Sequence, residues 1–472
     1  MSTKKTDYNI LKAASWYTIG NILVKSISFF VLPIFTSLMS TTEYGIYSVY
    51  LSYLTIFEVI ILLGLSSTVR IAKFDRDTNF SRYMSTISSI PVMGTIFIAF
   101  LLNLFMTFFH VDSLLSMSQT LWNYLFITSA SSAIAGIIGA RLVIDAKYRE
   151  YMSYSAINAV LNVGVSLILC RTIYKTNDIH MARVIGQCIA SLASTAFLMT
   201  VTKTRLKPEK IYIRKSLLWG IPLLFHTLAT VVLTQSDRIV IRYMNDYGAA
   251  GIYSIAVTLI IIPLTLQTSL ESAWAPWFYQ KMDAKDYSSI RKVNNLYIII
   301  FAVIIAEFML VSPEIIHIFT DKDYWDSVYC LVPLSISIFG EMLYCLPVNV
   351  EYYNKKTKYI MWGTVSVTLI NIVLDIIFVH FSGFIGAAYA TAVSKLLLFL
   401  FHFILSKKID SNAVFRKSVA FSAISILFGV NFFTVINVGF IFPRWILCGS
   451  VAGILLYFLI KNRAALKEYI KR

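Results

Sequence analysis

The chain has 472 residues, of which 57% are hydrophobic and only 14% are charged. Soluble domains carry about 25% charged residues, so this composition excludes a water-exposed surface over the whole length. The formal net charge of +16 would indicate a nucleic-acid partner in a soluble protein. In a membrane protein it first reports which loops carry the Lys and Arg residues.

Fourteen apolar segments are each near the roughly 20 residues that cross a bilayer as a helix. In chain order they cover 13–38, 44–68, 84–109, 119–141, 153–174, 180–201, 216–243, 249–270, 294–316, 328–351, 359–380, 384–405, 418–438 and 441–461. Backbone groups in lipid must be satisfied within the segment, so helices are expected. We therefore predict an all-α polytopic membrane protein with about 14 transmembrane helices.

The distribution of positive residues predicts the orientation. With the N-terminus in the cytoplasm, the cytoplasmic segments carry 32 of the 41 Lys and Arg residues. This asymmetry is typical of cytoplasmic loops. We expect a multi-pass protein with both termini cytoplasmic, membrane lipids as neighbours and no nucleic-acid partner.

Internal similarity predicts a duplication. GIYS occurs at 45–48 and again at 251–254, and a stripe of Gly186, Ala190 and Ser194 recurs 200 positions later as Gly386, Ala390 and Ser394. Asn162 has Asn371 as its counterpart. Six spans per copy give both halves one orientation, as in parallel-repeat transporters. The first predicted domain is a six-helix bundle over 1–202, followed by a basic cytoplasmic linker over 203–215. A second six-helix bundle covers 216–405, and a further helix pair with a basic tail covers 406–472.

Sequence motifs for catalysis are not found. The segments between spans are too short for a soluble catalytic domain, and no phosphate-binding GxxxxGK[ST] motif is present. The acidic stretches at 75–77 and 321–323 are interpreted as loop charges. The five cysteines have no metal-ligand spacing and are interpreted as packing residues. We expect no catalytic residue, no metal site and no cofactor, apart from a coupling H⁺ or Na⁺.

Three stretches resemble a known family. They are LTQSDRIVIRYMNDYGAAGIYSIA (233–256), SAWAPWFYQKM (272–282) and PEIIHIFTDKDYWDSVYCLVPLSI (313–336). With the repeat, they resemble the polysaccharide transporter family, the O-antigen and lipid-linked oligosaccharide flippase branch of the multidrug/oligosaccharidyl-lipid/polysaccharide exporter superfamily.

The resemblance implies a transporter and not an enzyme. Its substrate would be an undecaprenyl-diphosphate-linked oligosaccharide repeat unit, moved across the bacterial plasma membrane by alternating access. A cation-coupled multidrug exporter of the same superfamily is the alternative, and a polysaccharide polymerase or ligase is a third interpretation. Whether a complex with a polymerase forms stays open.

Three cations within the spans are candidates for a substrate cavity. They are Lys25, Arg238 and Lys395. Charges inside a membrane face a bundle interior or a wet cavity, and a lipid diphosphate needs cations in low dielectric. Pairing within the protein is the alternative for each, for instance Lys25 with Glu58.

The acids within the spans are counter-ions, ion-coupling sites or interhelical hydrogen-bond partners. They are Glu58, Asp237, Glu307, Glu341 and Asp375. Asn371 and Asp375 are four residues apart and share a helical face, which suits a small ion site. The sequence alone leaves these alternatives open.

Overall fold

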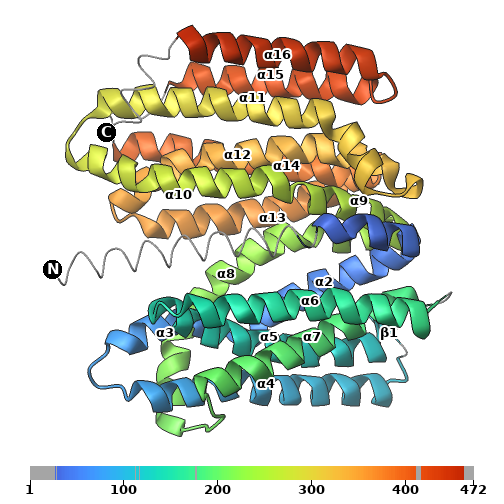
Figure 1. Ribbon diagram of the computed structural model, residues 1–472. Helices are drawn as coiled ribbons and strands as arrows, with labels where there is room; N and C mark the ends of the chain where they lie inside the picture. The colour runs from blue at the N-terminus through green and yellow to red at the C-terminus, as the bar shows by residue number, and fades with distance from the viewer. Residues whose placement is uncertain are drawn as a thin grey trace. The chain divides into compact units, whose positions relative to one another are not determined.

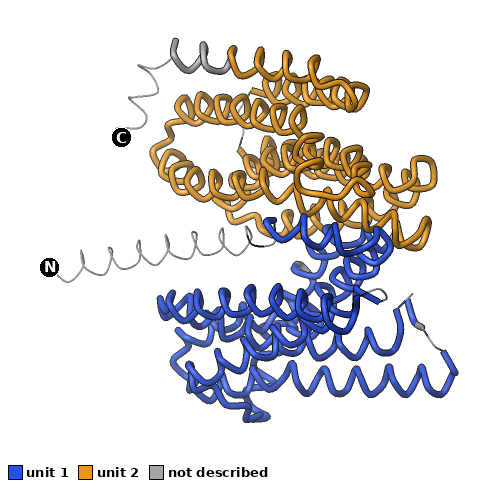
Figure 2. Tube along the Cα trace, turned by 45° about the vertical axis from the view of Figure 1, so that its right-hand side comes forward, with its two compact units in different colours: residues 1–239 blue, residues 240–472 orange. Residues whose placement is uncertain are grey.

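A computed structural model describes residues 27, 29–111, 113–115, 117–175, 178–410 and 416–461. Contacts divide the chain into two compact units, Met1–Ile239 (unit 1) and Val240–Arg472 (unit 2), coloured separately in Figure 2. The division falls inside one long helix, α8.

Unit 1 is a helical bundle with one small hairpin (Figure 1). Its elements after a short helix at Phe29–Leu38 are α2 (Thr41–Leu62), α3 (Leu65–Phe74), α4 (Phe80–Phe108), β1 (Ser113–Leu114), β2 (Met117–Ser118), α5 (Gln119–Ile144), α6 (Tyr148–Thr172), α7 (Ile179–Thr202) and the larger part of α8 (Lys210–Met244). The antiparallel β1–β2 pair precedes α5.

Unit 2 is also helical. Its elements are α9 (Tyr247–Leu259), α10 (Ile261–Asp283), α11 (Tyr287–Phe319), the 3₁₀ turn η1 (Lys322–Ser327), α12 (Val328–Tyr353), α13 (Thr357–Ser382), α14 (Phe384–Ile409), α15 (Lys417–Ile436) and α16 (Ile441–Lys461). The α15–α16 hairpin lies against α11 (Figure 1).

The predicted fold class, an all-α polytopic membrane protein, is confirmed. Among the described residues, eleven helices are long and apolar enough to cross a membrane, and the bent α8 makes a twelfth. These twelve overlie the predicted spans from 44–68 to 418–438. Most of span 13–38 lies outside the described residues, and α16 coincides with span 441–461.

Two interruptions shape unit 1. Leu63 and Gly64 take left-handed backbone conformations and separate α2 from α3. A Cβ at Gly64 would lie 2.4 Å from the carbonyl oxygen of Gly220 on α8, so only glycine permits this approach. Helix α8 bends by 43° between Lys210–Phe225 and Thr227–Met244, and it contains Pro222 shortly before the bend.

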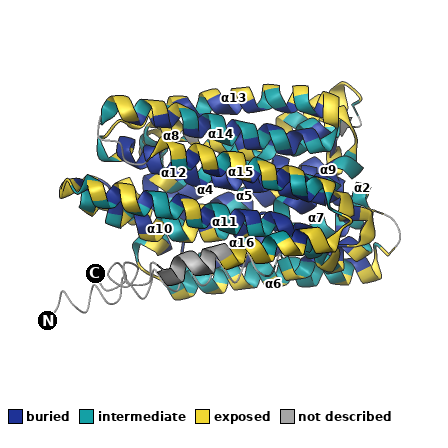
Figure 3. Ribbon diagram, turned by 90° about the horizontal axis from the view of Figure 1, so that it is seen from above, coloured by how far each residue is buried: buried dark blue, intermediate teal, exposed yellow. Residues whose placement is uncertain are grey.

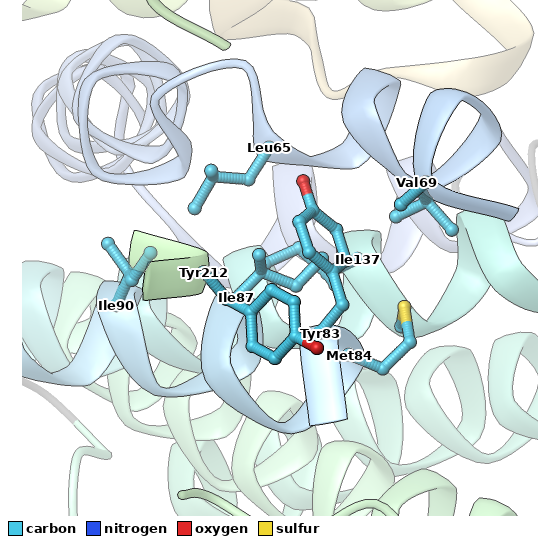
Figure 4. Packing of buried hydrophobic residues seen from close by; sticks show 9 residues of the cluster. Leu65, Val69, Tyr83, Met84, Ile87, Ile90, Ile137 and Tyr212 are labelled. Atoms are coloured by element: carbon cyan, nitrogen blue, oxygen red, sulfur yellow. The ribbon is translucent and has the colours of Figure 1, made fainter. Parts of the chain in front are cut away.

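An apolar cluster holds one end of unit 1 together (Figure 4). Tyr83 of α4 is fully buried and donates a hydrogen bond to Thr68 of α3, at 2.7 Å. Its ring meets that of Tyr212 from α8 edge to face. The buried phenol therefore keeps a hydrogen-bond partner, and the cluster joins four helices: α3, α4, α5 and α8.

Helix α12 is the core of unit 2. It is the most thoroughly buried of the candidate spans, and its most extensive helix contact is with α14. Figure 3 colours the helices by the burial of their residues. Cys330 reaches the carbonyl of Phe384, and Glu341 reaches Lys395. Both pairs are 54 positions apart, so α12 and α14 run parallel.

The two small-residue stripes mark close helix contacts. A Cβ at Gly186 of α7 would lie 2.9 Å from the backbone nitrogen of Ser166 of α6. A Cβ at Gly386 of α14 would lie 2.1 Å from the carbonyl oxygen of Phe378 of α13. Small residues at such positions let membrane helices approach closely. The domain boundaries drawn from the repeat stay a prediction, because compact units reflect contacts and a repeat reflects ancestry.

Candidate functional site

The Asp237–Arg238 pair lies on α8 within unit 1. Nη1 of Arg238 lies 2.6 Å from Oε1 of Gln235 and 3.3 Å from Oγ of Ser52 on α2. Asp237 is 5% exposed, whereas Arg238 is half-buried. Adjacent helical residues point about 100° apart, so the acid faces the interior while the guanidinium bridges to α2.

The predicted pairing of Lys25 with Glu58 is not tested by the described residues. Lys25 lies outside the described residues. Glu58 is half-buried on α2 and lies within electrostatic reach of Tyr154 on α6. Whether Lys25 pairs with Glu58 stays a prediction.

Lys395 of α14 pairs with Glu341 of α12. The ammonium nitrogen lies 2.7 Å from Oε2, and the side chains are 16% and 28% exposed. Gly340 of α12 lies against the backbone of Lys395. A Cβ added at Gly340 would lie 3.1 Å from the Cβ of Lys395. The pair thus joins two of the predicted site residues across the most extensive helix contact of unit 2. It keeps partial access to its surroundings, which a competing anion needs.

Glu307 of α11 faces the α15–α16 hairpin. Its Oε2 lies 2.6 Å from Sγ of Cys448, while its Oε1 is buried without a hydrogen-bond partner among the described residues. Two turns further along α11, Glu314 forms a two-pronged pair with Arg444 of α16, at 2.6 and 2.7 Å. Arg444 is 1% exposed. This ion pair anchors α16 to α11.

Asn371 and Asp375 are both fully buried on α13. Nδ2 of Asn371 donates to Oγ of Ser394 on α14, at 3.2 Å. Its Oδ1 has no hydrogen-bond partner in the part of the chain that the structure describes. An amide oxygen and a carboxylate one helical turn apart are suitable ligands for a hard cation.

The sequence analysis did not identify Glu351 and His402. Nδ1 of His402 on α14 lies 2.8 Å from Oε1 of Glu351 on α12, and both side chains are completely buried. Arg444 was likewise missed, although it lies within the predicted span 441–461. A histidine inside span 384–405 was the available signal, because ionisable residues within spans are rarely incidental.

One group of potential metal ligands is found among the described residues. Ligand atoms of Glu43, Asp178 and His180 all lie within 4.8 Å of one another. Oε2 of Glu43 accepts hydrogen bonds from the His180 backbone nitrogen and from Nδ1, at 2.7 and 2.6 Å. A helix N-terminus carries partial positive charge, which favours a carboxylate and disfavours a cation. We interpret Glu43 as a cap for α7, and the absence of a metal site stays a prediction.

The acidic stretch at 75–77 takes part in an ion pair. Nζ of Lys215 lies 2.5 Å from Oδ2 of Asp75 and 2.6 Å from Oγ1 of Thr78. The hydrogen bond from Lys215 holds the pKa of Asp75 below its usual value. This contact ties the end of α3 to the start of α8 within unit 1.

An apolar cleft of about 380 Å³ lies between α11, α15 and α16. Small side chains line much of it, among them Ala302, Ala306, Ser422 and Ala423. Its wall is almost entirely apolar, so it suits a hydrocarbon chain.

Comparison with known proteins identifies the family. The chain matches the family described as polysaccharide biosynthesis protein over residues 10–282, more than half of its length. A protein of the Lsg locus of Haemophilus influenzae is 21% identical over 398 residues, which covers 80% of this chain and 95% of that protein.

Solved structures share the fold. The lipid II flippase MurJ, in an inward closed conformation, aligns with a TM-score of 0.74 at 17% identity and covers 97% of this chain and 100% of that one. An inward-facing multidrug resistance MATE family transporter of the MOP superfamily aligns with a TM-score of 0.62 at 11% identity, covering 82% of this chain and 94% of that one. The resemblance inferred from the sequence is confirmed. The chain belongs to the polysaccharide biosynthesis protein family.

Proposed function

We propose that this protein is a flippase that moves an undecaprenyl-diphosphate-linked oligosaccharide repeat unit across the bacterial plasma membrane by alternating access. The unit would belong to O-antigen or another surface polysaccharide. The observation that carries the proposal is membership of the polysaccharide biosynthesis family together with the fold of MurJ over 97% of the chain. The protein would therefore act as a transporter and not as an enzyme.

The cations Lys25, Arg238 and Lys395 are the proposed contacts for the diphosphate. Lys395 is the best supported, because its partner Glu341 is a single carboxylate in a partly exposed pair. A diphosphate offers more acceptor oxygens and more charge than that carboxylate, so it competes effectively for the ammonium group. Release of Glu341 from Lys395 would then accompany substrate binding.

The apolar cleft beside α15 supports a lipid-linked substrate. A polyprenyl chain already lies among apolar lipid tails, so its affinity for this cleft would come from close packing and not from removal of water. The small side chains of α11 and α15 provide the room. A water-soluble sugar would gain nothing from this surface.

Ion coupling is part of the proposal. The described candidates for an H⁺ or Na⁺ site are Asn371 and Asp375 on α13 and Glu307 on α11. Asn371 and Asp375 are supported by the complete burial of an amide and a carboxylate one helical turn apart, a set of oxygen ligands that suits a hard cation. Glu58 and Asp237 are candidates in unit 1.

A cation-coupled multidrug exporter is the second candidate. The MATE transporter fold, at a TM-score of 0.62, and the surplus of acids over cations inside the spans favour it. The polymerase or ligase interpretation has no supporting observation among the described residues.

The location and the partners are also proposed. The distribution of Lys and Arg supports a bacterial plasma (inner) membrane protein with both termini cytoplasmic. Labelling of single introduced cysteines from either side of the membrane tests this orientation. Co-purification with a polysaccharide polymerase tests that proposed partnership.

Proteoliposomes test the function directly. A labelled polyprenyl-diphosphate sugar is placed in one leaflet, and an impermeant enzyme detects its arrival in the other. Protein-dependent flipping that is impaired in Lys25→Ala or Lys395→Ala supports the flippase with a cationic site. No flipping, together with cation-driven uptake of a drug-like dye, transfers support to the exporter.

A further inference from the structure

Glu351 and His402 form the most deeply buried titratable pair in the described part of unit 2. Oε1 of Glu351 lies 2.8 Å from Nδ1 of His402, and both side chains are 0% exposed. Glu351 lies in the last turn of α12, and His402 lies on the face of α14 two turns beyond Lys395. The pair bridges the same two helices as Lys395 and Glu341.

The pair leaves two polar atoms without partners. Oε2 of Glu351 and Nε2 of His402 are buried and have no hydrogen-bond partner among the described residues. The backbone of Gly363 on α13 closes the space at Nε2, where a Cβ would lie 2.5 Å away. Buried polar side chains are usually satisfied, so a pair kept only for stability would be expected to use these atoms.

The surroundings contain few charges. Tyr344 and Tyr352 of α12 lie within electrostatic reach of Glu351, and the Tyr344 ring packs edge to face on His402. Tyr344 also lies within reach of Glu341. From α10, Glu271 acts on Tyr352.

Other helices present apolar or uncharged groups near this face. Phe421 of α15 packs against Phe399 and Phe403 of α14, and α13 presents the backbone of Gly363. Among the described residues, no other charged side chain forms an ion pair or a hydrogen bond with the side chains of Glu351 and His402.

These features link the proton count of the pair to helix packing. With one proton between the carboxylate and the imidazole, the pair is neutral overall and tolerates a dry interior. Gain or loss of a proton leaves a net charge, which low dielectric disfavours. Water admitted between the ends of α12 and α14 removes this penalty. Proton exchange is therefore possible when that contact opens and suppressed when it is closed.

We propose that Glu351 and His402 form a proton-binding site that makes transport respond to pH. The proton resides between Oε1 and Nδ1 while α12 and α14 are packed. It exchanges with water at the end of α12 that precedes the basic residues Lys355, Lys356 and Lys358. Imidazole suits this role because its two ring nitrogens can each hold or release a proton. The inference rests on the transport function proposed above.

Flipping under a pH gradient tests the site. Full-length protein in proteoliposomes is given a labelled polyprenyl-diphosphate sugar, with and without a gradient of one pH unit. One coupled proton biases the distribution of the probe between leaflets by up to about tenfold per pH unit. Glu351→Gln and His402→Gln each keep a polar side chain of similar size but abolish the shared proton. The effect of the gradient is expected to fall to a ratio near one in both.

Ser335→Ala is the matched control. Ser335 is buried on the same helix and bonds only to the carbonyl of Leu331 among the contacts described, so this variant is expected to retain the full gradient response. A gradient response that survives in both pair variants overturns the proposal. So does a wild-type protein that flips the probe with no gradient effect.

Infrared titration of the purified protein separates this inference from the proposed function. A carboxyl band that changes with pH in the wild type and disappears in Glu351→Gln supports the proton site, even if no probe is flipped. Absence of any such titrating band in the wild type overturns it. Loss of flipping alone counts against the flippase and leaves this readout intact.

Discussion

Substitutions of the two members of the Lys395–Glu341 pair are expected to change substrate binding in opposite directions. Lys395→Ala should weaken binding of the substrate, and Glu341→Gln should strengthen it. Lys395→Ala removes a cation that we propose holds the diphosphate. Glu341→Gln removes the carboxylate with which the diphosphate competes. If the pair were only structural, both variants would weaken the α12–α14 contact and both would impair transport.

The distance and the burial of the pair determine how much flipping Lys395→Ala should lose. Nζ of Lys395 and Oε2 of Glu341 are 2.7 Å apart, and the two side chains are 16% and 28% exposed. Their exposure is intermediate between that of a surface ion pair and that of a fully buried one. Hydrogen bonds to charged groups contribute about 1.5–3 kcal/mol, above the roughly 0.2–1 kcal/mol of exposed pairs. Since about 1.4 kcal/mol corresponds to tenfold, Lys395→Ala should lower flipping at limiting probe about 10- to 100-fold.

The effect of Glu341→Gln should be smaller and opposite in sign. The substrate no longer has to displace a charged partner, so half-maximal flipping should occur at about tenfold lower probe density. The assay measures the initial flipping rate against probe density in proteoliposomes, with thermal stability in detergent as the control for folding. The same direction of change in both variants, matched by equal losses of stability, would refute the competition.

Three further predictions concern stability. Arg444→Leu should detach α16 from α11 and lower the free energy of unfolding by about 3–5 kcal/mol, because it leaves Glu314 without its partner in a largely buried pair. Faster hydrogen exchange in α16 would reveal this loss, and unchanged exchange would contradict it. Gly386→Ala should lower the melting temperature, with a penalty of about 1–3 kcal/mol or more, because its Cβ would overlap the α13 backbone. Gly429→Ala is its control, since a Cβ there meets nothing within 4 Å. Lys281 holds the pKa of Asp286 below its usual value, so this carboxylate stabilises the fold above the ordinary Asp range and loses that effect as pH falls toward its lowered pKa. Asp286→Asn should therefore lower the melting temperature at pH 7, with a difference that shrinks in acid; a difference that does not change with pH would oppose this cause.

Helix positions were predictable from the sequence because a bilayer imposes a local rule. About 20 apolar residues in succession must form a helix wherever they occur. Span 328–351 therefore anticipated α12 closely. Breaks were less predictable: the end of α2 depends on Gly64 meeting the backbone of Gly220, which is more than 150 positions away.

The candidate residues were predictable as a class, but their partners were not. An ionisable residue within an apolar span is visible in the sequence, as Lys395 and Glu341 were. Their pairing depends on the parallel register of α12 and α14, which no local pattern contains. Arg444 illustrates the same limit, because it follows a loop in the sequence yet is buried against Glu314.

The sequence by itself determined that this chain is a helical membrane protein and which spans carry charges, because burial in lipid and helix length act on each segment separately. Only the tertiary structure decided that Lys395 meets Glu341 and that His402 meets Glu351. Such pairings require two helices to approach within a few ångströms at one rotation and one register. Those quantities are fixed jointly by glycines, prolines and packed side chains far apart in the chain.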